Sequence, residues 1–95
     1  MVIGVCRIRL LIHDNHSLKG KRQVLKSLTE KVRNRFNVSV AEVGLNDSWR
    51  DAEVGVSAVG NDRAFVNSVL DKVLNFVVGL NTAEVVDHYI EILNV

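Results

Sequence analysis

The stretch that decides the fold is residues 2–13, VIGVCRIRLLIH, because its side chains alternate between two faces. One face carries Val2, Gly4, Cys6, Ile8, Leu10 and Ile12, and the other carries Ile3, Val5, Arg7, Arg9, Leu11 and His13. A period of two with one wholly apolar face is typical of a β-strand that buries one side. We therefore predict a sheet that is covered on one face.

Downstream, the pattern changes between helical and strand periods. Residues 17–36 place apolar side chains at helical spacing after Ser17, a residue type favoured as a helix N-cap. Turn residues 46–48 separate two further strands, and residue Gly79 is a natural C-cap for a second helix. The remaining elements are expected to be strands at 38–45, 51–59 and 84–94 and a helix at 62–78.

The same periodicity assigns side chains to faces. We expect the following to point toward the core: Ala41, Val43, Leu45, Ala52, Val54, Val56, Ala58, Phe65, Val66, Val69, Leu70, Val73, Val77, Val86, Ile90 and Ile92. The outward set is expected to be Ile3, Val5, Arg7, Arg9, Leu11, Val40, Glu42, Asp51, Glu53, Asp87, Tyr89, Glu91 and Leu93. Cys6 is expected to be an inert core residue, and His88 falls on the inward parity.

The order β-α-β-β-α-β predicts an α+β fold. Two right-handed βαβ-type units give a four-stranded antiparallel sheet with strand order 4-1-3-2 and both helices on one face. This is the ferredoxin-like arrangement, an α-β sandwich. A chain of 95 residues has room for one such domain, spanning residues 1–95.

Composition excludes several classes of protein. With 47% hydrophobic residues the chain is not disordered, and its one cysteine cannot form an intramolecular disulfide or a four-cysteine zinc site. No apolar run approaches the roughly 20 residues of a membrane span, so no membrane association is expected. A lone cysteine suits a reducing compartment, and we expect a cytoplasmic protein without a cofactor or metal.

Charge is distributed unevenly along the chain. Residues 1–41 hold nine basic and two acidic residues, whereas residues 42–95 hold three basic and nine acidic ones. Seven of the cations belong to the first predicted helix, whose one carboxylate is Glu30. These cations are Lys19, Lys21, Arg22, Lys26, Lys31, Arg33 and Arg35.

The start of that helix is the strongest functional signal. Lys19, Lys21 and Arg22 lie in its first two turns, where the helix dipole disfavours each cation by about 0.3–1 kcal/mol. A helix N-terminus combined with clustered cations can bind anions. The candidate anion- or RNA-binding residues are Lys19, Lys21, Arg22, Lys26 and Arg33, and the alternative is a solvated basic face.

Arg7 and Arg9 allow two interpretations on the outward face. They either form a ladder with the acidic residues of the neighbouring strands or belong to an RNA-binding sheet. The ladder is favoured because Tyr89 is the one aromatic residue on this face available to stack on a base. Tyr89 and Trp49 are the candidate partner contacts. For Trp49 the preferred interpretation is that it clamps the hairpin onto the end of the sheet, and the alternative is an exposed surface for stacking or partner binding.

Residues 13–16, His-Asp-Asn-His, could in principle hold a metal or exchange protons. No third ligand lies nearby in the sequence. Turn and cap chemistry is therefore the preferred interpretation.

Two segments resemble the signatures of the YlxP-like family of small bacterial proteins. Residues 16–22, HSLKGKR, are similar to the motif H-S-L-K-x-K-R, and residues 41–44, AEVG, with Asp47, Trp49 and Ala52, are similar to a second motif. Ser48 departs from the larger apolar residue expected there. The resemblance implies a ferredoxin-like fold and unknown function, and it carries Lys19, Lys21, Arg22 and Trp49 over as candidates. The neighbouring genes of the family, which include a ribosome-binding factor, imply RNA or ribosome association.

These observations favour a non-enzymatic domain that contacts the phosphates of an RNA or ribosome through its first helix. The alternative is a homodimeric interaction or regulatory module that uses the open sheet face, with Ile3, Val5, Tyr89 and Leu93 as its apolar part. An acylphosphatase-like enzyme is the third possibility. Such enzymes need a glycine-rich phosphate loop with an arginine after the first strand, where this chain has residues 13–16.

Overall fold

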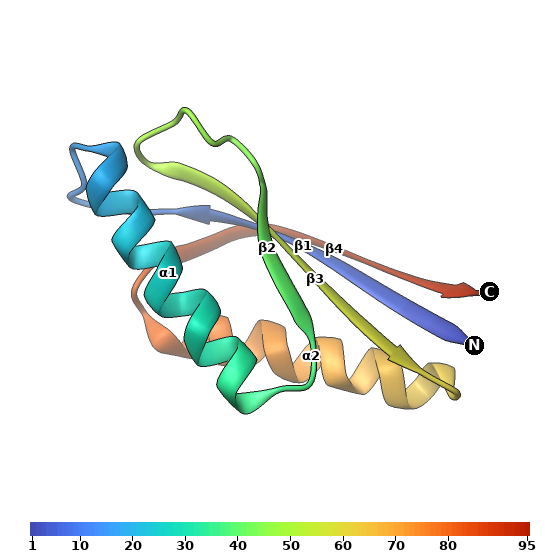
Figure 1. Ribbon diagram of the computed structural model, residues 1–95. Coiled ribbons are helices and arrows are strands. Elements are labelled where there is room, and N and C mark those ends of the chain that lie inside the picture. The colour runs from blue at the N-terminus through green and yellow to red at the C-terminus, as the bar shows by residue number, and fades with distance from the viewer.

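A computed structural model describes residues 1–95 as a four-stranded antiparallel sheet with two helices (Figure 1). The elements are β1 (Val2–Leu11), α1 (Leu18–Arg35), β2 (Ser39–Gly44), β3 (Asp51–Gly60), α2 (Arg63–Leu80) and β4 (Glu84–Asn94). Sheet order β2-β3-β1-β4 confirms the predicted ferredoxin-like α+β topology, and both helices lie against one face. Neither helix is long and apolar enough to cross a lipid bilayer.

The two central strands, β1 and β3, form the sheet side of the hydrophobic core. The even-numbered residues of β1 and β3 point toward the helices, as predicted, and Cys6, Ile8, Leu10 and Val54 are buried almost completely. Gly4 allows α2 to approach β1 closely, since a Cβ at this position would lie 2.5 Å from Val66 Cγ1. Eighteen buried residues form one continuous core between the sheet and the helices.

Both helices begin at side-chain caps. The Oγ of Ser17 accepts a hydrogen bond from the Gly20 N–H at 3.0 Å, and the Asp62 carboxylate accepts one from the Phe65 N–H at 2.9 Å. The cap predicted at Gly79 is wrong. Helix α2 continues through Gly79, and Asn81 adopts the left-handed conformation that ends it.

The predicted inward position of Phe65 is also wrong. The buried stripe of α2 consists of Val66, Leu70, Val73 and Val77, at spacings of four, three and four residues. Phe65 lies to the side of this stripe in the first turn and is 62% exposed.

Strand β2 turns the opposite face inward from the one predicted. Val40 is buried and Glu42 half-buried on the helix side, whereas Ala41 and Val43 are exposed on the open face. The register explains this, because Val40 pairs with inward-facing Val56 and paired residues point to the same face. Leu45 lies beyond the strand in the turn, where its φ is +60°.

Strand β4 contains an irregularity that changes one predicted position. Between Arg9 and Leu10 the register shifts, so Val86 becomes an extra residue that is 45% exposed and Val85 takes the inward position. Asp87, Tyr89 and Glu91 lie exposed on the open face, as predicted. His88 is exposed rather than buried because it belongs to an edge strand.

Candidate nucleic-acid interface

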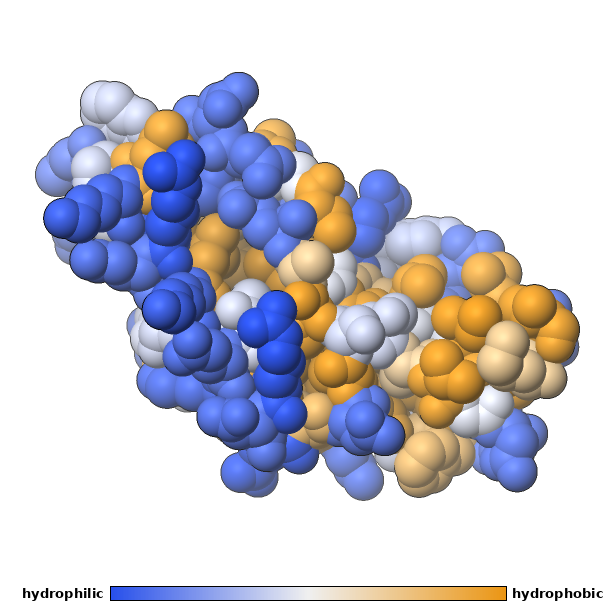
Figure 2. Space-filling model, viewed as in Figure 1, coloured by the Kyte–Doolittle hydropathy of each residue, from blue (hydrophilic) through white to orange (hydrophobic).

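The exposed surface of α1 carries cations that have no acidic partner. Lys19, Arg22, Lys26 and Arg33 are exposed and fall within about 60° of arc at 100° per residue. None has a carboxylate within 4.0 Å, since the ion pairs of the structure are Arg7–Glu53, His13–Glu84 and Lys21–Glu42. Hydrophilic side chains accordingly gather along α1 in Figure 2, whereas apolar ones gather toward the other end of the molecule. We call these four residues the α1 stripe.

The stripe lies on the side of α1 that faces strand β2. Arg33 establishes this, because its Nη2 donates a 2.7 Å hydrogen bond to the carbonyl of Val40. Strand β2 lies at the edge of the sheet, so carbonyls on its outer side are free to accept such a bond. The guanidinium has five N–H groups, so donors remain for a further ligand.

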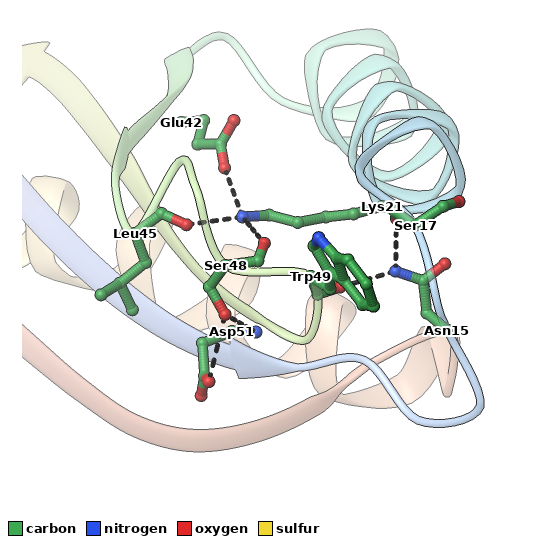
Figure 3. Close-up of polar contacts among 8 residues, drawn as sticks. All are labelled: Asn15, Ser17, Lys21, Glu42, Leu45, Ser48, Trp49 and Asp51. Carbon is green, nitrogen blue, oxygen red and sulfur yellow. Dashed lines mark hydrogen bonds and ion pairs between the residues drawn. The ribbon is translucent and has the colours of Figure 1, made fainter.

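Lys21 does not belong to this exposed set, contrary to its sequence-based assignment. Its side chain is only 1% exposed. The Nζ atom donates to the carbonyls of Leu45 at 2.7 Å and Ser48 at 2.8 Å, and lies 3.2 Å from Oε2 of Glu42 (Figure 3). All three donors of the ammonium are thereby directed into the chain, and Lys21 is removed from the candidate anion surface.

The position of Lys21 in the helix explains its burial. It precedes Leu25, Leu28 and Val32 by four, seven and eleven residues, so it lies on the buried stripe of α1. Its partners come from β2 and the following turn. Sequence reasoning missed Glu42, Leu45 and Ser48 because Glu42 was placed on the wrong face. The helical spacing of Lys21 was the one signal that could have indicated them.

Asn15 also links the start of α1 to the turn between β2 and β3. Its Nδ2 donates to the carbonyl of the N-cap residue Ser17 at 2.8 Å and to that of Trp49 at 2.6 Å (Figure 3). Lys21 and Asn15 thus fasten the turn between β2 and β3 to the start of α1. The backbone of Trp49 is held in this way, but its ring is 54% exposed, so the ring is not a buried clamp.

The loop at residues 13–16 makes local polar contacts. Nε2 of His13 lies 2.8 Å from Oε1 of Glu84, which joins the end of β1 to the start of β4. Asp14 adopts a positive φ of 56°, as turn residues commonly do. The structure brings together no group of three or more His, Cys, Asp or Glu side chains that could hold a metal ion.

The predicted charge ladder on the open face is confirmed for Arg7 and wrong for Arg9. Arg7 lies 3.8 Å from Glu53, and its guanidinium lies 5.2 Å from the centre of the Tyr89 ring. Arg9 has no acidic oxygen within 4.0 Å, although Glu53 and Asp87 are its cross-strand neighbours. The Tyr89 hydroxyl donates to Glu91 at 3.1 Å, and this hydrogen bond with the nearby negative charge raises the pKa of Tyr89.

Cys6 is a core residue, as predicted. It is 1% exposed. Burial, with a contribution from the negative charge of Asp71, raises the pKa of the thiol to about 11. A thiol in this environment remains protonated at neutral pH and is a poor nucleophile.

Comparison with known proteins finds relatives of unknown function. The family model described as "Protein of unknown function (DUF503)" matches residues 3–90. The uncharacterized protein YlxP of Bacillus subtilis (strain 168) is 40% identical over 76 residues, which cover 80% of this chain and 83% of that protein. The de novo designed protein Foldit4 has 15% sequence identity and a TM-score of 0.53, with coverage of 99% of this chain and 97% of that one. The likeness to Foldit4 concerns the fold alone.

Proposed function

This chain belongs to the DUF503 family, and we propose that it is a non-enzymatic domain that binds the phosphate backbone of RNA, free or within a ribosome, through α1. The observation that carries the proposal is the α1 stripe itself. Four cations occupy one narrow side of the helix without an acidic partner. Their neutralisation by phosphates would release condensed counterions from RNA, which is the main source of sequence-independent affinity.

The position of the cations along the helix supports a binding role. Lys19 and Arg22 lie in the first two turns of α1, and the first turn contains no acidic residue. Cations there oppose the helix dipole and reduce stability slightly. Solubility would be served equally well by cations at the other end of the helix, so an anionic ligand gives a reason for this placement.

The spacing of the stripe also fits an extended polyanion. Lys19 and Arg33 are separated by fourteen residues, which corresponds to about 21 Å along the helix axis at 1.5 Å per residue. A single small anion would need convergent donors, whereas these side chains follow a line. A nucleic-acid strand presents phosphates along such a line, so RNA is favoured over a free phosphate compound.

The test is a fluorescence-anisotropy titration with a labelled RNA of mixed sequence at several salt concentrations. Lys19→Glu, Arg22→Glu and Lys26→Glu should each weaken binding to every RNA sequence tested, since phosphate contacts carry no base information. With about four phosphates engaged, the log–log slope of the wild-type association constant against salt should be about −3 for single strands. Each reversal should make that slope less steep by about 1.

Lys72→Glu is the matched control, because Lys72 is an exposed lysine on α2 and its reversal changes the net charge equally. Binding that is independent of salt would overturn the proposal. The same conclusion would follow if Lys72→Glu weakened binding as much as the stripe variants. A thermal melt of each variant separates lost binding from lost folding. Lys19→Glu and Arg22→Glu should in addition raise stability by some tenths of a kcal/mol, because they remove cations that oppose the helix dipole.

A further inference from the structure

The sheet face opposite the helices has no cover in the single chain, and its side chains form rows that the strand register defines. One row across β2, β3, β1 and β4 consists of Ala41, Gly55, Arg7 and Tyr89. The row therefore has two small residues at one side and two large ones at the other. This asymmetry contributes to an open depression of about 650 Å³ beside Ala41 and Gly55. It is bordered by Val43, whose side chain lies against Gly55, and by the paired side chains of Arg7 and Tyr89.

We propose that a second copy of this chain covers the face, related by a two-fold axis that runs parallel to the strands between the two sheets. This axis places β4 of one copy over β2 of the other and β1 of one copy over β3 of the other. Each residue then faces a residue of the same row in the other copy. Tyr89 of the second copy then lies over Ala41, and Arg7 of the second copy lies over Gly55. The same contacts occur twice, so each depression is filled by the large side chains of the other copy.

The charges of the next row agree with this arrangement. Glu53, Arg9 and Asp87 lie side by side across β3, β1 and β4. Arg9 has no ion pair in its own chain. The two-fold axis brings Arg9 of one copy over Glu53 of the other, so two arginines and two glutamates alternate in sign around the axis. Face-to-face contact therefore offers Arg9 a partner beyond its cross-strand neighbours.

Two further rows are compatible with the same axis. Val59, Ile3 and Leu93 form an apolar row at the far end of the face, where Val59 of each copy meets Ile3 of the other. Between this row and the depression, Glu91 of one copy lies over Ser39 of the other, whose hydroxyl can donate to the carboxylate. In these four rows the facing residues thus include matches of size or charge, whereas in the fifth row Leu11 of one copy lies over Asp51 of the other.

The area of the face is sufficient for a stable dimer. Strands about 4.8 Å apart with a rise of about 3.3 Å per residue give this face a projected area of about 600 Å². In this arrangement β4, with 11 residues, lies over β2, with 6 residues, so two copies would bury about 1,000 Å², the area that a specific interface has to reach. Sheets that pack face to face usually align their strands to within about 30°, as an axis parallel to the strands requires.

The experiment measures molar mass by size-exclusion chromatography with light scattering, over concentrations up to roughly millimolar. Affinity depends on how well the contacts match rather than on area, and because the proposed contacts are matched in size and charge the wild type should be a dimer within this range. Ala41→Tyr should give a monomer because the new ring meets Tyr89 of the second copy. Tyr89→Ala should weaken the dimer at least tenfold because it leaves the depression empty.

The double variant Ala41→Tyr/Tyr89→Ala gives the decisive result. It moves the ring from β4 to β2 and should restore the dimer, because the ring introduced on β2 of each copy would then lie over the methyl group left on β4 of the other. Asn75→Tyr, which adds a ring at an exposed position on α2, is the control and should remain dimeric. A wild-type monomer at every concentration, or a dimer that Ala41→Tyr leaves intact, would overturn the proposal. A dimer without rescue in the double variant would overturn the proposed axis. None of these outcomes depends on RNA binding by α1.

Discussion

Replacement of Lys21 by methionine is expected to destabilise the fold strongly, although lysine is ordinarily a surface residue. The variant keeps most of the apolar stem and removes the ammonium that binds Leu45, Ser48 and Glu42. Two carbonyls lose a charged donor, which is worth about 1.5 kcal/mol or more each, and the Glu42 carboxylate loses its counter-charge. Loss of one partner of a buried ion pair costs about 3–5 kcal/mol. We expect about 3 kcal/mol, at the lower end of that range, because the Glu42 side chain remains 24% exposed and partly hydrated.

Urea unfolding followed by circular dichroism at pH 7 measures this difference. Arg22→Met is the matched control: it removes the adjacent cation, which is exposed and has no acidic partner, and should change the free energy of unfolding by no more than about 0.5 kcal/mol. The double variant Lys21→Met/Glu42→Leu should recover at least about 1 kcal/mol, since an apolar pair replaces the stranded carboxylate. A loss below about 1 kcal/mol for Lys21→Met would refute the reasoning, because it would mean that the ammonium is hydrated in solution.

Two further predictions concern the core. Because the pKa of Cys6 rises from 9.0 to about 11 on folding, the unfolded chain ionises first and stability should fall as the pH rises from about 9 to 11, by about 2–3 kcal/mol. Urea titrations at several pH values would detect this fall, which should be absent in Cys6→Ala; an unchanged fall in that variant would exclude Cys6 as the cause. Gly4→Ala should destabilise the fold by about 1–3 kcal/mol, because its Cβ would lie within 2.7 Å of atoms of both Val66 and Leu70. Thermal unfolding would test this, and a wild-type melting temperature would show that α2 can move away without cost.

Strong periodicity made most of the fold predictable. Strand β1 and strand β3 each have one apolar face, so the sequence indicated both the strands and the direction in which they face. Ser17 was recognisable as a cap because the polar loop before it gives way to a helical pattern. The alternation of apolar and polar residues is less regular in the edge strands β2 and β4. In β2 both Val40 and Val43 are apolar, and alternation alone could not decide which of them is buried.

The candidate site was predictable only in part, because sequence spacing does not show which charges are neutralised in space. The exposed cations of α1 could be inferred from the scarcity of acidic residues in that helix. The burial of Lys21 depends on Glu42 and on two backbone carbonyls in a turn, and carbonyls are present at every position of a sequence. Its contact with Glu42 depends on the position of β2 beside α1, which the sequence pattern does not show.

Arginine side chains bind backbone carbonyls at both edges of the sheet, and these contacts affect how further copies of the chain could be added. Arg33 from α1 occupies the Val40 carbonyl on the outer side of β2, and Nη1 of Arg63 from α2 donates to the Ile92 carbonyl of β4 at 3.3 Å. The Asp87 carboxylate also accepts the His88 N–H at 2.9 Å. Addition of strands from other chains needs such backbone groups to be unoccupied, and it can continue without limit. Because both borders of the sheet are partly blocked, the proposed association through its broad face would be favoured over strand addition. A two-fold contact there would be complete after two copies and could not propagate into fibres.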